Sequence, residues 1–227
     1  MQEINIVRND LQRTFMKIGI ISDTHDDLNS VDRAISIFNR EKVSRVIHAG
    51  DFIFPGVVER FRKLESAKLV GVLGNNDGEK FGLLKKFEEI GGELKRSDLG
   101  EIEDDDNKDV RIAVYHGTDQ NLREAAIQSG IYDVFIHGHT HVKRWAQKLI
   151  KISDKEKKIL ALNPGTAHHN FPTFPPVGEG WNEDQPTVII YDTITKESRF
   201  FLLLEYGQEL SSDELGKLEQ LGRLQTE

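Results

Sequence analysis

Five short segments of the sequence carry residue types that bind divalent metals, and each follows a short apolar run. Carboxylate, imidazole and amide donors suit Mn²⁺, Fe, Zn²⁺, Co²⁺ or Ni²⁺, whereas a pure Mg²⁺ or Ca²⁺ site would use fewer histidines. The chain has no cysteine, which excludes thiolate ligands, disulfides and cysteine nucleophiles. The segments are Ser22-Asp23-Thr24-His25, Ala49-Gly50-Asp51, Gly74-Asn75-Asn76-Asp77, Tyr115-His116-Gly117 and Gly138-His139-Thr140-His141.

Taken singly, each segment also has a structural explanation. An aspartate after a strand often caps a helix, Gly-Asp and Gly-Asn-Asn-Asp are common turn sequences, and a lone histidine such as His116 is more often structural. Taken together, they place two aspartates, one asparagine and four of the eight histidines at predicted strand ends. Because a carboxylate can bridge two cations about 3.5–4 Å apart, the set predicts a dinuclear metal centre.

The elements that must position these segments are short buried strands. Their length and their β-branched composition predict strands with both faces covered. Since the carboxyl ends of parallel strands converge on one crevice, side chains distant in sequence can meet there. The predicted strands that precede the segments are 18–21, 45–47, 69–73, 112–115 and 134–136.

The segments between these strands have the periodicity of amphipathic helices, and this alternation of strands and helices ends after residue 142. We expect Asn29 or Ser30 to cap the first helix and Thr118 to cap the last. The predicted helices are 30–38, 57–64, 79–90 and 119–128. The later apolar runs, which have no helices between them, predict antiparallel strands over 144–150, 158–162, 187–191 and 198–204. An α/β fold with two packed sheets and helices on the outer faces satisfies both halves.

The bulk composition limits the class of protein. With 227 residues, 37% of them hydrophobic and 30% charged, the chain suits one domain with small additions. No apolar run reaches the roughly 18 residues of a membrane helix, and the N-terminus does not resemble a signal peptide, so we expect a cytoplasmic protein without a membrane partner. The formal charge of −8 argues against an extended nucleic-acid surface.

The ends of the chain predict three parts. Residues 1–15 are expected to form an N-terminal extension, 16–206 the catalytic domain, and 207–227 a C-terminal helical tail that begins at the capping box Ser211 to Glu214. Met16 leaves open which methionine is the native start. The leucines of the tail pack on their own domain or form a dimer contact, so a homo-oligomer is left open.

The order of the motifs Asp-x-His, Gly-Asp, Gly-Asn-x-Asp, His and Gly-His-x-His resembles the calcineurin-like metallophosphoesterase superfamily. The resemblance runs from residue 17 to about 166, because Asn163-Pro164-Gly165-Thr166 is similar to a loop of its small phosphodiesterase branch. It implies a four-layer α/β/β/α sandwich of two mixed sheets with helices on both outer faces. This agrees with the fold expected from the apolar pattern.

The resemblance also implies a role for each site residue. A hydroxide that bridges two divalent metals, with Mn²⁺ the first expectation and Ni²⁺, Fe, Zn²⁺ or Co²⁺ the alternatives, attacks the phosphorus of a diester. One metal is held by Asp23, His25, Asp51 and His141, and the other by Asp51, Asn75, His116 and His139. Asp51 bridges the two metals, and Asp51, Asn76 and His139 are the expected catalytic residues.

Asn76 departs from the family pattern, in which a histidine often follows the metal-ligand asparagine. An amide donates a hydrogen bond but cannot protonate a leaving group near neutral pH. That favours diesters with good leaving groups, so we expect a phosphodiesterase with a small phosphodiester substrate. His168 or His169 is an alternative source of the proton.

Other functions fit the sequence less well. A catalytically weak scaffold of the same fold, acting through protein contacts, would have lost ligands, whereas all seven positions are filled here. A nuclease would have a basic groove or additional domains, and Asn76 and the small size argue against a protein phosphatase. His48 and His137 lie within predicted strands, where we expect structural roles.

Overall fold

The computed structural model describes most of the predicted catalytic domain. The described residues are 17–102, 110–152, 155–169 and 185–203, together with 209, 211 and 213. The predicted N-terminal extension, residues 103–109 and nearly all of the predicted helical tail lie outside these ranges. The boundaries of the three parts therefore stay predictions.

The first sheet has six strands in the order β11-β10-β1-β2-β3-β4. The strands β1 to β4 are parallel, while β10 runs antiparallel to both β1 and β11. This sheet is therefore mixed. Its strands are β1 (Lys17–Ile21), β2 (Arg45–His48), β3 (Lys68–Gly71), β4 (Glu93–Leu94), β10 (Thr187–Asp192) and β11 (Ser198–Leu202).

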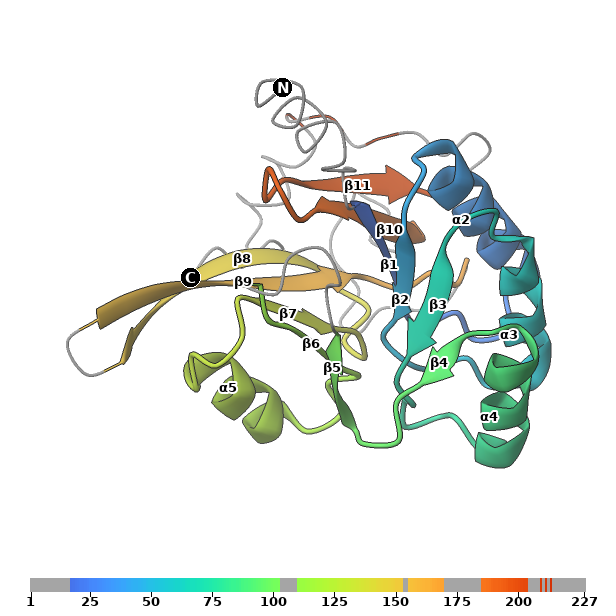
Figure 1. Ribbon diagram of the computed structural model, residues 1–227, viewed down its shortest axis with the longest axis horizontal. Coiled ribbons are helices and arrows are strands. Elements are labelled where there is room, and N and C mark those ends of the chain that lie inside the picture. The colour runs from blue at the N-terminus through green and yellow to red at the C-terminus, as the bar shows by residue number, and fades with distance from the viewer. Residues whose placement is uncertain are drawn as a thin grey trace, which may run out of the picture.

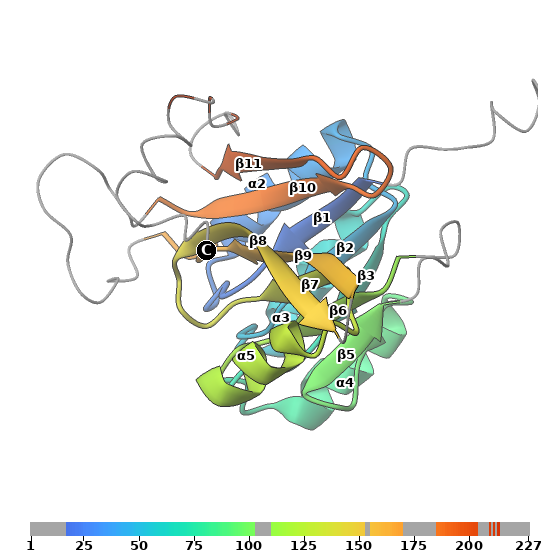
Figure 2. The same cartoon turned by 90° about the vertical axis from the view of Figure 1, so that its left-hand side faces the viewer.

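The second sheet has five strands in the order β5-β6-β7-β9-β8. β6, β7 and β9 are parallel neighbours, and the antiparallel strands β5 and β8 form the two edges. The two sheets stack face to face (Figure 2). The strands are β5 (Leu99–Ile102), β6 (Ile112–Tyr115), β7 (Val134–His137), β8 (Lys143–Ile152) and β9 (Lys155–Pro164).

Helices cover the outer face of each sheet (Figure 1). The first sheet is covered by α2 (Leu28–Arg40), α3 (Pro55–Arg60) with the 3₁₀ turn Phe61–Lys63, and α4 (Lys80–Glu89), and the second by α5 (Gln120–Gln128). Among the described residues, no helix is both long and apolar enough to cross a lipid bilayer.

Three apolar layers hold the four structural layers together. Phe38 of α2 lies in the layer between the helices and the first sheet, Ile20 lies between the two sheets, and Ile127 of α5 lies beneath the second sheet. All three side chains are fully buried, and burial of one such side chain is worth about 1.5–3 kcal/mol. The predicted α/β/β/α sandwich is confirmed.

The predicted strands are present, with ends that shift by a few residues, but the short strands β4 and β5 were not predicted. Both predicted helix caps were wrong. The side chain of Asp27 accepts a hydrogen bond from the Ser30 backbone N–H (3.0 Å), and Asp119 accepts from Asn121 and Leu122. In each case a nearby aspartate caps the helix because its carboxylate reaches the free N–H groups of the first turn.

Replacing Asp27 with alanine tests the corrected cap of α2. Asp27 also accepts hydrogen bonds from the Ser30 hydroxyl (2.9 Å) and the His169 backbone N–H (2.9 Å). We expect Asp27→Ala to lower the free energy of unfolding by about 0.5–2 kcal/mol in urea denaturation. Asn29→Ala, at the exposed position predicted from sequence, should change it by less than about 0.5 kcal/mol, and an equal loss in both would contradict the assignment.

Candidate metal centre

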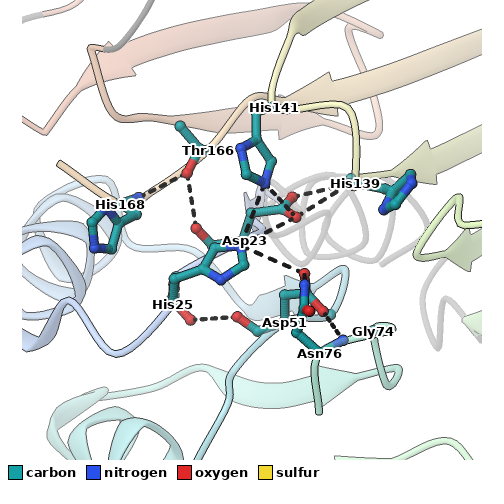
Figure 3. Close-up of polar contacts among 12 residues, drawn as sticks. Asp23, His25, Asp51, Gly74, Asn76, His139, His141, Thr166 and His168 are labelled. Atoms are coloured by element: carbon teal, nitrogen blue, oxygen red, sulfur yellow. Dashed lines mark hydrogen bonds and ion pairs between the residues drawn. The ribbon is translucent and has the colours of Figure 1, made fainter. Parts of the chain in front are cut away.

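The predicted ligands lie where the carboxyl ends of strands from both sheets meet. Figure 3 shows five of them, Asp23, His25, Asp51, His139 and His141. Asp23 and His25 follow β1, Asp51 follows β2, Asn75 comes after β3, His116 follows β6, and His139 and His141 follow β7. The first sheet supplies Asp23, His25, Asp51 and Asn75, and the second supplies the remaining three. The site therefore forms only when the two sheets are packed together.

A first group of side chains joins Asp23, His25 and His141, each with one ligand atom within 4.8 Å of the others. The Nε2 atoms of the two histidines are 3.3 Å apart. Asp23 Oδ1 lies 3.3 Å from Nε2 of His141 and 4.0 Å from Nε2 of His25. Two imidazole nitrogens and a carboxylate oxygen that face a common point match the donors of a divalent transition-metal site.

A second group joins Asp23, Asp51 and His116 within the same 4.8 Å limit. His116 Nδ1 lies 2.8 Å from the carbonyl oxygen of Ala49. Because a carbonyl oxygen only accepts, Nδ1 must carry the hydrogen of this bond. In the neutral ring, Nε2 then presents a lone pair to the amide oxygen of Asn75, 2.9 Å away. Two acceptors at this distance repel each other unless a proton or a metal ion lies between them, so the imidazole nitrogen and the amide oxygen are placed where they could bind one metal ion.

His139 occupies a different position from the other predicted ligands. Its backbone N–H donates to the two carboxylate oxygens of Asp23 at 3.3 and 3.1 Å. Its ring lies to one side of the cluster (Figure 3), edge-on to the His116 ring with centroids 5.2 Å apart. The structure thus places His139 beside the second group, without including it in either group of three.

The backbone is strained at most of the predicted ligands. A positive φ is uncommon for a residue other than glycine and persists only where surrounding contacts enforce it. Two such contacts are the hydrogen bonds from the backbone N–H groups of Thr24 and His25 to the carbonyl oxygen of Asp51, at 3.1 and 3.2 Å. The positive values are 53° at Asp23, 40° at His25, 61° at Asp51, 67° at His139 and 58° at His141.

The Asp51 carboxylate is held in its ionised form by its neighbours. Asn76 donates twice, from its backbone N–H to Oδ1 (2.9 Å) and from its side-chain amide to Oδ2 (2.8 Å). Burial by itself would raise the pKa of Asp51, but His116 and the two Asn76 donors outweigh it and hold that pKa well below its ordinary value. Asn76 therefore orients and stabilises a negatively charged Asp51.

Asp77 ties the Asp51 loop to the Asn75 loop, a role that was not predicted. Its carboxylate accepts hydrogen bonds from the backbone N–H groups of Gly74 (2.7 Å), Asp51 (3.0 Å) and Ile53 (2.8 Å). The last of these holds Ile53 at a φ of 77°, a rare conformation for a β-branched residue. The signal in the sequence was the aspartate that ends Gly-Asn-Asn-Asp.

Asn163 and Thr166 join two further ligand loops. The amide of Asn163 is 3.0 Å from the Gly138 carbonyl oxygen and 3.0 Å from Thr140 Oγ1. Thr166 Oγ1 donates to the Asp23 carbonyl oxygen at 2.9 Å (Figure 3). The loop Asn163-Pro164-Gly165-Thr166 therefore links the segment of Asp23 to the segment of His139 and His141 through hydrogen bonds.

Two of the histidines outside the predicted ligand set, His48 and His137, are buried, whereas His168 lies beside a predicted ligand. His48 accepts from the Gly50 N–H at Nδ1 (3.2 Å) and lies 3.1 Å from Thr24 Oγ1 at Nε2, and burial lowers its pKa well below the ordinary value. Burial likewise lowers the pKa of His137 to about 3. His168 differs because its ring lies edge-on to that of His25, with centroids 6.2 Å apart.

Comparison with known proteins gives consistent matches. The profile of the calcineurin-like phosphoesterase superfamily domain matches residues 16–196. A phosphodiesterase of Methanocaldococcus jannaschii is 38% identical over 188 residues, which cover 83% of this chain and 99% of the relative.

Solved structures give the same picture. The structure of an archaeal phosphodiesterase has a TM-score of 0.64 and 37% identity, and the match covers 82% of this chain and 99% of that one. A phosphoesterase from E. coli shares the fold, with a TM-score of 0.53, 18% identity and coverage of 86% and 97%.

Two glycines in one loop allow a matched test of the site's geometry. A Cβ atom at Gly74 would lie 2.1 Å from Asp51 Oδ1, whereas one at Gly78 would have no atom within 4 Å. We expect Gly74→Ala to displace Asp51 and weaken Mn²⁺ binding by about 10–100-fold in isothermal titration calorimetry. Gly78→Ala should bind like the unmodified protein, and equal affinities for both variants would contradict the role given to Gly74.

Proposed function

The chain belongs to the calcineurin-like phosphoesterase superfamily, and from that membership we propose that it hydrolyses small phosphate diesters with two divalent metal ions at the candidate metal centre. Family membership makes the protein a metal-dependent phosphoester hydrolase. The preference for diesters, the pair of metals and the role of each residue are the parts that we propose.

One observation carries the proposal of two metals. Asp51 Oδ2 lies 3.5 Å from Nε2 of His25 and also 3.5 Å from Nε2 of His116. The two histidines belong to different groups of ligands. A single carboxylate oxygen equally close to both groups is the arrangement that a bridging ligand requires.

The proposed ligand sets follow from these contacts. When bound, the metals supply positive charge beside the phosphate oxygens and a water molecule of lowered pKa as the nucleophile. Four histidines in the set favour Mn²⁺, Ni²⁺, Fe, Zn²⁺ or Co²⁺ over Mg²⁺, and we propose Mn²⁺ first. One set is Asp23, His25, Asp51 and His141, and the other is Asp51, Asn75, His116 and His139.

The residues of the chain itself prepare the site for this chemistry. Asn76 keeps Asp51 ionised and oriented through two hydrogen bonds, and it cannot supply a proton to the leaving group. The absence of a general acid at this position typically lowers the rate by about 10²–10⁴-fold, which matters least for diesters with acidic leaving groups. The relative from Methanocaldococcus jannaschii, itself a phosphodiesterase, supports the same preference. The cytoplasmic location stays a prediction.

Hydrolysis of a bis-aryl phosphate diester and an aryl phosphate monoester tests the proposal. The protein is stripped of metal with a chelator and restored with Mn²⁺, Ni²⁺, Zn²⁺ or Mg²⁺. We expect metal-dependent cleavage with a higher kcat/KM for the diester. Asp51→Asn removes the shared ligand and should lower that value by more than about 100-fold, whereas Asp98→Asn, at an exposed position, should leave it unchanged.

Four results would contradict the proposal. Turnover that persists without metal would exclude the metal-dependent mechanism, and full activity of Asp51→Asn would exclude Asp51 as the bridge. A higher kcat/KM for the monoester would make the enzyme a monoesterase. Stoichiometric metal binding without turnover of either substrate would favour the scaffold function instead.

A further inference from the structure

A group of charged side chains lies between α5 and β8, on the face of the second sheet that points away from the first. Glu124 of α5 accepts hydrogen bonds from Lys148 Nζ (2.8 Å) and from Arg123 Nη2 (3.3 Å). Arg144 of β8 shares this face with Lys148, since alternate residues of a strand point the same way. Three positive charges thus surround one carboxylate, a net charge of +2 in a chain of net charge −8.

The Arg144 guanidinium is buried and poorly satisfied. The residue is 9% exposed, and its side chain carries five N–H donors. Glu124 Oε1 lies 3.9 Å from Arg144 Nη1, which is too far for a hydrogen bond. Within the described part of the chain, the buried Nε of Arg144 has no hydrogen-bond partner. A buried N–H donor without an acceptor is unfavourable, so an acceptor is expected beside Arg144 Nε.

A second unpartnered nitrogen lies nearby on the same face. Asn163 is the cross-strand neighbour of Arg144, and its amide is 3.1 Å from Nδ1 of His137. His137 is 1% exposed, and among the described residues its Nε2 has no partner. Two buried nitrogens that lack partners among the described residues therefore lie on the same face of the second sheet, on β7 and β8, with β9 and Asn163 between them.

We propose that the group of charged side chains between α5 and β8 binds a small free oxyanion of the phosphate class, with Arg144 as its main ligand. A phosphate dianion would neutralise the net charge of +2, and a guanidinium binds phosphate oxygens with paired, charge-assisted hydrogen bonds. The ion enters from the side of Glu124 and Lys148, whose side chains are 27% and 20% exposed, compared with 10% for Arg144. The site shares no residue with the proposed metal ligands.

Nuclear magnetic resonance of the arginine Nε–H groups reports directly on this site. Inorganic phosphate is added to the full chain loaded with diamagnetic Zn²⁺, at constant ionic strength. We expect saturable shifts of the Arg144 and Arg123 Nε–H signals. In Arg144→Met, the affinity for phosphate read from Arg123 should fall at least about tenfold. Lys151→Met, which removes a charge at an exposed position of the same strand, should respond like the unmodified protein.

The remaining outcomes overturn the proposal. No shift with phosphate, or an equal shift with chloride, would mean that water satisfies the two nitrogens. A response that disappears in Asp51→Asn would place the phosphate at the metal centre. A response of equal affinity to phenyl phosphate would assign the site to phosphate groups carried on esters rather than to the free ion. Because Asp51→Asn should retain the response, failure here is separable from failure of the proposed catalytic function.

Discussion

The Asp51 carboxylate is the group on which the rest of the site depends. One of its oxygens lies equally far, 3.5 Å, from imidazole nitrogens supplied by the two different sheets. For the proposed bridging role the carboxylate has to be ionised and fixed, because a neutral or mobile group could not balance two positive charges. The two hydrogen bonds from Asn76 meet both requirements. The geometry of the site therefore depends on how the two sheets pack against each other.

Unusual backbone conformations in the loops around Asp51 help to position the predicted ligands. Five of the seven predicted ligands have positive φ angles, and Asp77 and Thr166 supply hydrogen bonds to the backbone of their loops. Gly138 is required for the same reason, since a Cβ there would lie 1.9 Å from Ser22 Oγ and 2.6 Å from Asp23 Oδ2. The strain at the site is balanced by contacts between loops that are distant in sequence.

Local sequence signals were sufficient for the fold and for the list of candidate ligands. Short apolar runs followed by Asp, Asn or His predict a buried strand and place its end to within about two residues, and the structure brings the residues after these strands to one edge of the two sheets. The helix caps at Asn29 and Thr118 were wrong because several polar residues stand near each helix start, and only the three-dimensional path of the chain decides which one reaches the free N–H groups. The roles of Asp77, Asn163 and Arg144 could not be read from the sequence. Each depends on a contact between segments whose relative placement follows only from the packed sheets.

The central claim is that Asp51 bridges two metal ions, and anomalous diffraction at the manganese edge from crystals of the Mn²⁺-loaded protein tests it most directly. The account predicts two peaks about 3.5–4 Å apart, one on each side of the Asp51 carboxylate. The first should lie beside His25 and His141, and the second beside Asn75 and His116. A single peak, or two peaks without Asp51 between them, would contradict the account.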